Sequence, residues 1–571
     1  MNILGIHNTG ITSSAALVVD GELVFACAEE RLNRNKYSKY FPTLAMEACL
    51  GHAGLRLEQL DCVAIGWNPA LNIQSRFRSG FSEWPAYAGA RFYSVANTLL
   101  PRLPESELIA TEQVFRTAGA EHLRLVHVNH HLAHCANAFF LSGHPEAAIL
   151  SCDGYGERAC TVWAIGRGRN IEIVRELRFP HSIGCFYSAI TQFLGYVPDH
   201  DEWKVMGAAA YGDPGRYRSE MAGLLRYEAD GEIELDLRYF DHFNFDSKSM
   251  LTRKAFEALG APRTPSQPFE QRHFDLAAAA QAITEDYLAQ AVNWLAQRSG
   301  VGALCLSGGV MMNSVFNGKI AASRRFDDVY LSYAPDDSGN SIGAALWAAA
   351  DLGDPLPPQL PGGASPYLGP AYDDADILAL LERYGLNARP LADVTGETAA
   401  LLDAGAVVGW FQGRMEFGPR ALGNRSILAD PRRAEMKDRI NAAVKYREAF
   451  RPFAPAVPLE VAADWFEMPP GTTVPYMEKV FLVLPHRRAA IPAVVHADGS
   501  GRLQTVDSRA NPLFHQLLTV FGERTGVPIL LNTSFNLNGE PIVASPTDAI
   551  RTFFTSGLDA LVMGGLLLRK R

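Results

Sequence analysis

The start of the chain indicates the fold class, because residues 1–28 read MNILGIHNTGITSSAALVVDGELVFACA. Apolar and β-branched residues stand on both sides of Asp20 and Gly21, a pair that favours the tight turn of a β-hairpin. The apolar run just after Met1 predicts a buried first strand, and this start lacks the basic residues and long apolar run of a signal peptide. We therefore expect a cytoplasmic protein whose first domain opens with a hairpin-rich sheet.

Outward from this start, strand-like and helix-like segments alternate along 571 residues. A chain of this length is too long for one hydrophobic core, so the pattern predicts an α/β protein of two or more domains. The segment LGDPLPPQLPGGASPYLGP is dense in Pro and Gly and has no periodicity, as expected of a linker. We place the first domain at residues 1–352, the linker at 353–370, the second domain at 371–571, and insertions at about 70–118 and 213–270.

The composition narrows the classes of partner. A net charge of −10 argues against a nucleic-acid partner held through phosphate contacts, because such affinity comes from clustered Lys and Arg. No run approaches the ~20 apolar residues that a membrane-spanning helix needs. None of the eight cysteines forms a CxxC pair, which disfavours a zinc ribbon and a redox dithiol. These features predict a disulfide-free cytosolic protein that binds neither nucleic acid nor membrane.

A cluster of histidines, HVNHHLAH, follows an apolar strand and opens a predicted helix. His130 and His134 are about one helical turn apart, so they face the same way and can grip one metal ion. Asp153 ends another apolar strand and is the next candidate ligand. A ligand set of nitrogen and oxygen without thiolate leaves ferrous iron, manganese and zinc open. The alternative is that these histidines only cap the helix and satisfy backbone groups.

Glycine-containing turns recur in the first domain, in KVMGAAAYG, LSGGVMMN and PDDSGN. A strand–glycine–helix turn exposes backbone N–H groups at the start of a helix, which suits a phosphate or a ribose. Each of them alone is typical of a structural turn. Their number within one domain favours a nucleotide-binding fold.

The second domain carries a basic segment in which cations stand among Gly, Pro and Phe. Cations fixed in this way can address several phosphate oxygens at once. Further along, Arg502, Asn532 and Ser534 add polar groups at predicted strand ends. The sequence therefore predicts a site for one or two phosphorylated small molecules. The cations of the basic segment are Arg414, Arg420, Arg425, Lys445, Arg447 and Arg451.

Ordered blocks along nearly the whole chain resemble one family. They read EERLNR, NHHLAH, DGYGE, EWKVMGAAAYG, LSGGVMMNS, EFGPRALGNRSILADPR, FRPFAP and LLNTSFN. The family is that of the carbamoyltransferases of natural-product pathways related to NodU. The resemblance implies an N-terminal domain of the actin/hsp70-like ATPase superfold and a C-terminal YrdC-like α/β domain. It also implies an enzyme that forms carbamoyl-adenylate from carbamoyl phosphate and ATP and then transfers the carbamoyl group to a small-molecule hydroxyl, as in antibiotic biosynthesis.

The resemblance assigns residues to three groups. The family's iron ligands, with Fe(2+) as the implied metal, fall on His130, His134, Asp153 and Asp337. A carbamoyl-adenylate pocket in the first domain falls on Lys36, Gly154, Gly207, Gly308 and Asn313. Contacts to carbamoyl phosphate and to ATP, which Mg(2+) accompanies, fall on Arg420, Lys445, Arg447, Arg451, Arg502, Asn532 and Ser534.

The chain departs from the family after its first strand. Relatives usually carry a His-Asp pair there, and its histidine is their candidate base for the acceptor hydroxyl. This chain reads GITSSA over residues 10–15, with neither residue. His7 is then the candidate base. Asp199, His200 and transfer without a dedicated base are the alternatives.

Three other functions compete with this interpretation. A tRNA-modifying threonylcarbamoyl transferase shares both fold types, but the acidic balance and the lack of a basic face argue against it. A hydrogenase-maturation protein of the HypF type would need an acylphosphatase module and cysteine zinc motifs, which the sequence lacks. A metal-binding ATPase or regulator without carbamoyl transfer is left open by the missing His-Asp pair.

The sequence does not identify the acceptor. The two insertions are expected to shape its pocket, because loops on a fixed scaffold usually carry specificity. Aromatic residues in the insertion at 70–118 favour a bulky, partly apolar acceptor. The alternative is that this insertion packs on itself or on the second subunit of a homodimer.

Overall fold

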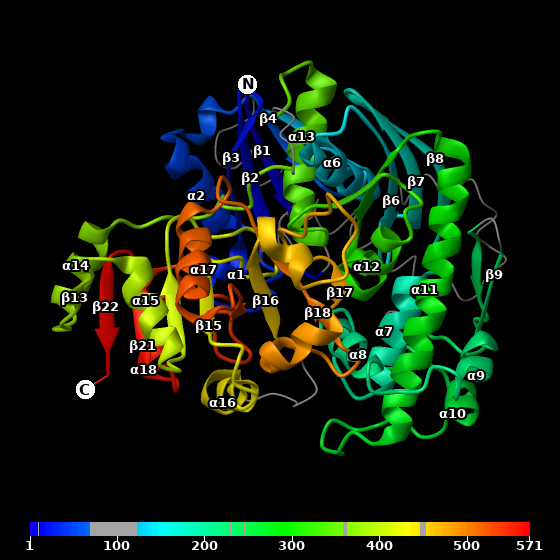
Figure 1. Ribbon diagram of the computed structural model, residues 1–571. Coiled ribbons are helices and arrows are strands. Elements are labelled where there is room, and N and C mark those ends of the chain that lie inside the picture. Colours follow the sequence, from blue (N-terminus) through cyan, green and yellow to red (C-terminus); the bar gives the residue numbers. More distant parts are fainter. Residues whose placement is uncertain are drawn as a thin grey trace. The chain divides into compact units, whose positions relative to one another are not determined.

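The computed structural model describes residues 1–8, 11–68, 123–228, 231–244, 247–357, 363–445 and 453–570. Helices and strands occur throughout, which confirms the predicted α/β class (Figure 1). Within the described ranges, no helix has both the length and the apolar character needed to cross a bilayer. All eight cysteines are buried and free, as predicted.

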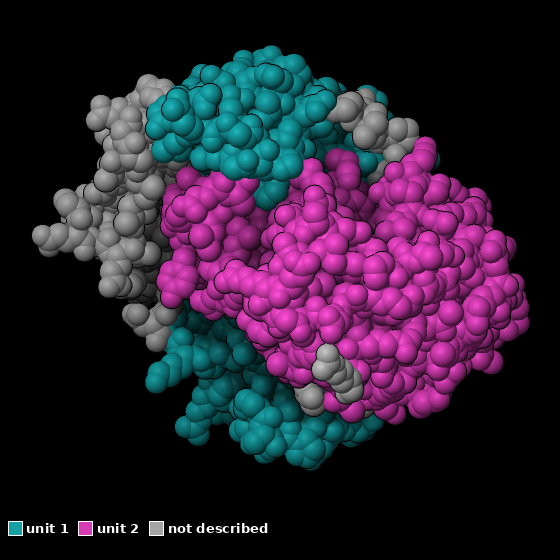
Figure 2. Space-filling view, turned by 90° about the vertical axis from the view of Figure 1, so that its left-hand side faces the viewer, with its two compact units in different colours: residues 1–25, 49–313, 324–363 teal, residues 26–48, 314–323, 364–571 magenta. Residues whose placement is uncertain are grey.

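Contacts divide the chain into two compact units, which Figure 2 colours separately. Residues 26–48 and 314–323 belong to the second unit, although the predicted first domain contains both segments. The domain boundaries expected from the sequence stay a prediction. The contact-based units differ from them at these two segments. Unit 1 comprises residues 1–25, 49–313 and 324–363, and unit 2 comprises residues 26–48, 314–323 and 364–571.

The opening residues form a sheet in which five described strands lie in the order β3-β2-β1-β4-β5. Strand β1 pairs antiparallel with β2 and parallel with β4. Asp20 and Gly21, with φ of 49° and 83°, make the tight turn between β2 and β3, so the predicted hairpin is confirmed. The bounds are β1 (Asn2–His7), β2 (Ser14–Val19), β3 (Glu22–Ala28), β4 (Cys62–Ile65) and β5 (Arg124–His127).

A second sheet of unit 1 repeats this arrangement. Its described strands lie in the order β12-β11-β6-β7-β8, with β6 antiparallel to β7 and parallel to β11. In both sheets the strand that comes first in the chain lies in the middle, between a meander and two parallel strands. This duplicated topology confirms the predicted actin/hsp70-like fold class. The bounds are β6 (Glu146–Cys152), β7 (Ala159–Arg167), β8 (Asn170–Arg178), β11 (Ala303–Ser307) and β12 (Asp328–Leu331).

Helices α6 (His130–Ser142) and α13 (Asn340–Leu352) pack on each other and α13 packs on β1 (Figure 1). A Cβ on Gly343 would lie 1.9 Å from the carbonyl oxygen of Ala133, so glycine permits the close approach of the two helices. Further described elements of unit 1 are α7 (Ile183–Phe193), α8 (Glu202–Ala209), α9 (Arg218–Ala222), β9 (Leu225–Tyr227), β10 (Ile233–Leu235), α10 (Arg253–Leu259) and α11 (Gln271–Ser299).

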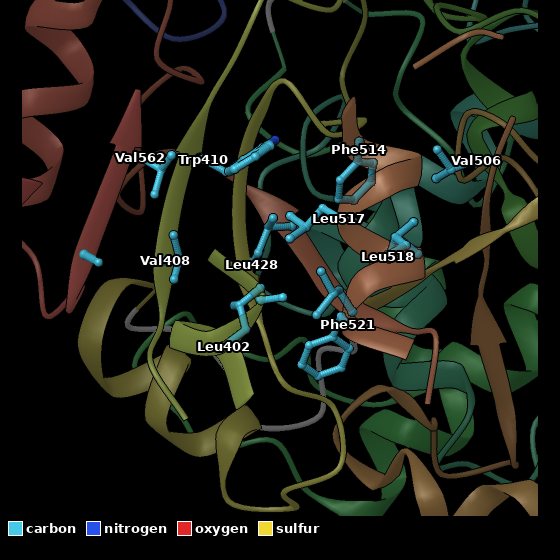
Figure 3. Close-up of a cluster of buried hydrophobic side chains, with 14 of the residues drawn as sticks. Leu402, Val408, Trp410, Leu428, Val506, Phe514, Leu517, Leu518, Phe521 and Val562 are labelled. Carbon is cyan, nitrogen blue, oxygen red and sulfur yellow. The ribbon is translucent and has the colours of Figure 1, made fainter. Parts of the chain in front are cut away.

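Unit 2 is built on a mixed sheet whose described strands lie in the order β13-β22-β21-β14-β15-β20-β16-β19. Trp410 and Leu428 from this sheet belong to a buried cluster with Phe514, Leu517 and Phe521 of α17 (Pro512–Thr525) (Figure 3). Burying each such side chain contributes roughly 1.5–3 kcal/mol to folding. The strands are β13 (Arg389–Pro390), β14 (Val408–Phe411), β15 (Arg425–Ala429), β16 (Ala454–Pro458), β19 (Gln504–Val506), β20 (Leu530–Ser534), β21 (Ala560–Met563) and β22 (Leu566–Arg569).

Shorter elements complete the described part of unit 2. A separate pair, β17 (Val480–Leu482) and β18 (Ser500–Arg502), is antiparallel. Besides α17, the described α-helices of unit 2 are α1 (Glu29–Asn33), α12 (Ser314–Ala322), α14 (Asp374–Arg383), α15 (Val394–Asp403), α16 (Met436–Ile440) and α18 (Pro546–Phe554). Helix α2 (Thr43–Ala53) spans the boundary between the units.

The apolar run over residues 560–568 is interrupted by Gly564 and Gly565. The structure has a hairpin there, β21 and β22, that turns at Gly564 and Gly565. Gly564 has a φ of 54°, and the N–H of Gly565 donates to Asp374 Oδ1 at 3.0 Å. Apolar residues continue on both sides of the two glycines, which conceals this turn in the sequence.

Candidate functional site

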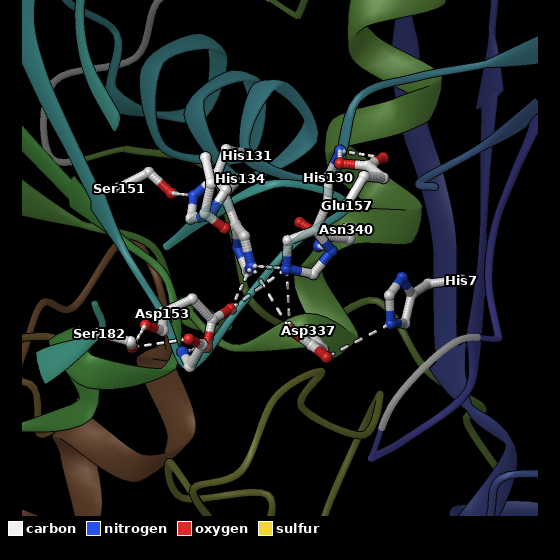
Figure 4. A network of polar contacts seen from close by, with 12 residues as sticks. His7, His130, His131, His134, Ser151, Asp153, Glu157, Ser182, Asp337 and Asn340 are labelled. Atoms are coloured by element: carbon white, nitrogen blue, oxygen red, sulfur yellow. Dashed lines mark hydrogen bonds and ion pairs between the residues drawn. The ribbon is translucent and has the colours of Figure 1, made fainter. Parts of the chain in front are cut away.

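Four side chains of unit 1 converge on one point (Figure 4). The Nε2 atoms of His130 and His134 lie 3.2 Å apart. Asp153 Oδ2 lies 3.2 Å from the first and 2.9 Å from the second, and Asp337 Oδ1 lies 3.5 and 3.4 Å from them. All four ligand atoms lie within 4.8 Å of one another, so the structure brings together the four residues predicted as metal ligands. Two imidazole nitrogens and two carboxylate oxygens are a donor set that fits a divalent transition-metal ion.

The first turn of α6 is held by two polar side chains. Asn129 caps the helix, because its Oδ1 accepts the N–H of Leu132 at 2.9 Å. The carboxylate of Glu157 accepts the N–H of His130 at 2.9 Å and that of Asn68 at 2.6 Å. Glu157 thus connects the loop after Asp153 to the helix that carries both histidines. The block DGYGE was a signal for this carboxylate, although sequence reasoning did not assign it to the site.

Asp153 stands at the end of β6, where glycine lets the backbone come close. A Cβ on Gly308 would lie 2.1 Å from the carbonyl oxygen of Cys152, and Gly308 has a φ of 92°. Ser182 donates to the carbonyl oxygens of Asp153 and Gly154 at 3.2 and 2.6 Å. Gly308, predicted as a pocket residue, therefore has a structural reason to be glycine.

The two carboxylates favour positive charge where the ligand atoms meet. Burial lowers the pKa of His134, but hydrogen bonds and charges from Asp153 and Asp337 outweigh it and raise this pKa to about 9. Burial and the neighbouring Asp337 raise the pKa of Asp153, but hydrogen bonds from the two histidines hold it below its usual value. Burial also raises the pKa of Asp337, and the charge of His130 outweighs it and holds the pKa well below the usual range. This environment suits a bound cation.

His7, the predicted base, lies beside this cluster at the end of β1 (Figure 4). Its side chain is fully buried, and its Nε2 lies 3.6 Å from Asp337 Oδ2. The rings of His7 and His130 have their centroids 5.9 Å apart. Neither ring nitrogen of His7 makes a hydrogen bond with a described residue.

Two further residues of the predicted adenylate pocket lie in unit 1 near these elements. Gly154 follows Asp153 directly, and its N–H donates to Asp153 Oδ1 at 2.7 Å. Asn313 exchanges two amide hydrogen bonds, both of 3.0 Å, with Gln281 of α11. Gln281 was not identified from the sequence, where it stands among the alanines of a long helix.

The other two predicted pocket residues take positions that the sequence did not indicate. Gly207 lies within α8, not in a strand-to-helix turn, because the helix that begins at Glu202 continues through Ala209. Lys36 belongs to unit 2, where its ammonium lies 5.1 Å from the ring centroid of Tyr37.

Unit 2 has a polar cluster of its own around Lys445, the last residue of the helical segment Asn441–Lys445. This lysine is 5% exposed. Its Nζ donates to the carbonyl oxygens of Ser534 and Asn536 at 2.6 and 2.9 Å, and to Asn536 Oδ1 at 2.8 Å. These acceptors hold the ammonium in place but carry no negative charge themselves. The positive charge of this fixed ammonium can attract an anionic ligand.

Two amide side chains, those of Asn532 on β20 and Gln504 on β19, form a pair on the main sheet of unit 2. Asn532 donates to the carbonyl oxygen of Ala421 at 3.2 Å and to Gln504 Oε1 at 2.8 Å, and Gln504 donates to the carbonyl oxygen of Leu422 at 2.9 Å. Asn532 Oδ1 is buried and has no hydrogen-bond partner among the described residues. The two carbonyl groups directly follow Arg420 in the chain, so the loop of Arg420 lies against this pair. Gln504 was missed by sequence reasoning, and its spacing of two from Arg502 was the available signal.

Two arginines of the basic segment, Arg414 and Arg425, donate to backbone carbonyl groups, a role that the sequence did not indicate. Fully buried Arg425 donates to the carbonyl oxygen of Pro370 at 3.1 Å. Arg414 donates to that of Leu368 at 2.6 Å. Each carbonyl group lies more than 40 residues before its arginine in the chain. No local pattern could therefore reveal them.

Glu416 shapes the loop that carries Arg420. Its Oε1 accepts the N–H groups of Leu422, Asn424 and Arg425 at 2.7, 2.8 and 3.1 Å. One buried carboxylate oxygen thereby fixes the loop and leaves the Arg420 side chain partly exposed.

The remaining predicted phosphate contacts divide into two groups. Ser534 belongs to the Lys445 cluster, and Arg502 ends β18, where it pairs with Val480. Arg447 and Arg451 lie outside the described residues, as does the insertion at 70–118.

Two family models match most of the chain. The model described as Carbamoyltransferase N-terminus matches residues 2–346, and the model described as Carbamoyltransferase C-terminus matches residues 399–570. The four-residue cluster of unit 1 lies within the first match, and the Lys445 cluster lies within the second.

Similar proteins cover the chain to different extents. The chain is 37% identical over 587 residues to nodulation protein NolNO of Sinorhizobium fredii, which covers 100% of this chain and 81% of the relative. It is 41% identical over 449 residues to nodulation protein NolO of Bradyrhizobium diazoefficiens, covering 78% and 79%. Among solved structures, full-length HypF in its phosphate- and nucleotide-bound form is 13% identical with a TM-score of 0.32, covering 62% of this chain and 55% of HypF. A likeness at that level carries no argument about function.

Proposed function

Since the chain belongs to the carbamoyltransferase family, we propose that it forms carbamoyl-adenylate from carbamoyl phosphate and ATP in unit 2, and in unit 1 transfers the carbamoyl group to a hydroxyl of a small-molecule natural product. The first step consumes one water molecule and releases phosphate from carbamoyl phosphate and pyrophosphate from ATP. In the second step the hydroxyl oxygen displaces AMP from the carbamoyl carbon. The family match supports carbamoyl transfer itself. The division into two steps is supported by two differently built polar clusters, one cationic and one of histidines and carboxylates.

The adenylation step needs fixed positive charge, because negative charge builds on phosphoryl oxygens as bonds to phosphorus break. Lys445 supplies a buried, immobilised cation, and Arg420 extends from a loop that Glu416 fixes. Asn532 Oδ1 offers a buried acceptor, which suits the NH2 of a carbamoyl group. Together these groups would bind both phosphorylated substrates and orient the carbamoyl end, with Mg(2+) accompanying ATP.

His130, His134, Asp153 and Asp337 would hold a metal ion, proposed as Fe(2+) with manganese and zinc as alternatives. When bound, the ion would stabilise negative charge on the carbonyl or phosphoryl oxygen of the adenylate. The chain itself holds the four ligand atoms within 4.8 Å of one another, with both histidines buried and both carboxylates partly buried.

His7 is the proposed base for the acceptor hydroxyl. A general base must come within hydrogen-bond reach of the proton that it removes. His7 is buried beside the cluster, and its ring nitrogens make no hydrogen bond with a described residue. Asp337, 3.6 Å from Nε2, would stabilise the protonated imidazole that forms.

One observation carries the proposal more than any other. The four predicted ligands are spread from residue 130 to residue 337, yet they meet at one point within the part of the chain that matches Carbamoyltransferase N-terminus. Two histidines and two carboxylates at one point are a donor set that can hold a divalent metal ion for such a transfer.

The test incubates the full-length protein with ATP, carbamoyl phosphate and ferrous iron, without acceptor and without oxygen. Carbamoyl-adenylate is followed by mass spectrometry and phosphate release by a colorimetric assay. We expect product from the wild type and at least tenfold less from Lys445→Ala. Arg509→Ala serves as the matched control, because Arg509 is an exposed cation of the same unit paired with Asp507. No product from the metal-replete wild type would reject the proposed adenylation.

A further inference from the structure

His130 is contacted at both of its ring nitrogens. Its Nε2 faces the other three residues of the proposed metal site. Its Nδ1 lies 3.1 Å from Nδ2 of Asn340, the first residue of α13 (Figure 4). Both side chains are buried, Asn340 at 0% and His130 at 1% exposure. The other end of the amide, Asn340 Oδ1, has no hydrogen-bond partner among the described residues.

The proton on His130 can occupy only one ring nitrogen while the imidazole is neutral. If Nε2 binds a metal ion, this atom gives its lone pair to the ion, so Nδ1 must carry the proton. An N–H group needs an acceptor, and an amide nitrogen is not one. The two ends of an Asn amide have nearly the same shape and are assigned from their hydrogen bonds. A half-turn of the Asn340 amide would therefore bring its partnerless oxygen to the Nδ1–H group.

We propose that Asn340 is a positioning residue for the metal site. In the metal-loaded protein, Asn340 Oδ1 accepts a hydrogen bond from Nδ1–H of His130 and fixes the tautomer that presents Nε2 to the ion. This inference rests on the metal site proposed above. Loss of such a partner typically weakens metal affinity 10–100-fold.

The packing of α13 keeps Asn340 at this position. Gly343, one turn further along the helix, contacts the backbone of α6 at Ala133 so closely that a Cβ there would lie 1.9 Å from the carbonyl oxygen. The helix that carries the amide and the helix that carries His130 are thus held together by backbone contact. The close helix contact thus keeps the Asn340 amide beside the imidazole of His130.

Two substitutions of similar size separate an acceptor role from a donor role. Asn340→Asp keeps oxygen acceptors and removes the amide N–H, whereas Asn340→Leu removes both. Metal-free full-length protein is titrated with Zn(2+) against a competing chelator, and thermal unfolding of the metal-free variants reports structural damage separately. We expect Asn340→Leu to bind zinc 10–100-fold more weakly and Asn340→Asp to bind at least as tightly as the wild type. Equal weakening in both variants would overturn the proposal.

A second measurement keeps the test decisive if Asn340→Leu fails to fold. In zinc-loaded wild type labelled with 15N-histidine, we expect the NMR spectrum of His130 to show a protonated Nδ1. An unprotonated Nδ1 would overturn the proposal. Wild-type zinc binding that Asn340→Leu leaves unchanged would reject this inference alone, whereas a wild type that binds no metal would reject the metal site and the inference with it.

Discussion

Helix α6 carries three histidines within five residues, and each of their side chains lies in a different environment. His131 bonds Ser151 and a backbone carbonyl, and burial lowers its pKa to about 3, so it is a neutral core residue. His134 meets two carboxylates, which raise its pKa to about 9. At the scale of single residues, burial and the nearest charges decide which histidine can serve as a ligand.

His7 provides the first prediction at this scale. His7→Gln should lower the rate of carbamoyl transfer roughly 10²–10⁴-fold, because it removes the proposed base. Adenylate formation should continue, since it depends on unit 2. Single-turnover transfer from preformed carbamoyl-adenylate measures the effect, with zinc affinity as the check that the metal site is intact. An unchanged transfer rate would show that another group, or none, acts as the base.

Glu202 provides a pH prediction. Burial raises the pKa of this carboxyl from 4.5 to about 7. The folded protein then holds a proton that the unfolded chain has released, so this group makes folding less stable as pH rises from about 4.5 to about 7. Glu202→Gln stays neutral. Its glutamine oxygen can accept both bonds that end on Oε1, from Ser188 and from the N–H of Asp199, each 2.7 Å long.

The free energy of unfolding of both proteins is measured in urea at about pH 5, 6, 7 and 8. We expect the stability of Glu202→Gln relative to the wild type to increase with pH across this range. A difference that does not change with pH would mean that Glu202 titrates at its ordinary value in the folded protein.

At the scale of elements, the metal ligands depend on how two helices begin. Helix α6 starts at His130 and α13 starts at Asn340, and these two residues contact each other. The first turn of a helix has N–H groups without partners in the helix, so caps decide how firmly it is held. A ligand in a first turn is only as well placed as the cap before it.

Asn129→Ala should therefore have two effects. Loss of the cap to Leu132 should lower the free energy of unfolding by about 1 kcal/mol. Zinc affinity should also fall, because the turn that carries His130 loosens. Asn129→Ser, which keeps an oxygen acceptor, is the matched control and should retain most of both. Urea unfolding and zinc titration test this, and a serine variant as weak as the alanine variant would contradict a capping role.

At the scale of the whole molecule, two units with different folds each carry one polar cluster. The sheets of unit 1 have the same topology twice, and the sheet of unit 2 has another order. This division lets each cluster have its own electrostatics, one with a buried lysine and one with two buried histidines and two partly buried carboxylates.

The two clusters should consequently be separable by mutation. His134→Ala should abolish transfer to an acceptor but still permit adenylate formation, because His134 lies in unit 1. Lys445→Ala should show the reverse when supplied with preformed carbamoyl-adenylate. Both half-reactions are followed by mass spectrometry. Loss of adenylate formation in His134→Ala would mean that the steps are not divided between the units as proposed.

The sequence by itself determined features that depend on near neighbours. The turn at Asp20 and Gly21 follows from their backbone preferences, and the shared direction of His130 and His134 follows from the helical period. The α/β class follows from the alternation of apolar patterns. Asp337 as a ligand, in contrast, came only from the family resemblance, because no spacing rule links it to a histidine some 200 residues earlier.

The tertiary structure alone decided which distant groups meet. It showed the duplicated sheets of unit 1, the place of residues 26–48 in unit 2, the amide of Asn340 at His130, and the carbonyl groups that bind Arg414 and Arg425. The physical reason is that helical period and turn geometry act over a few residues, whereas these contacts are set by how packed elements fill a common core. Packing brings segments together without regard to their separation along the chain, so a linear pattern does not contain it.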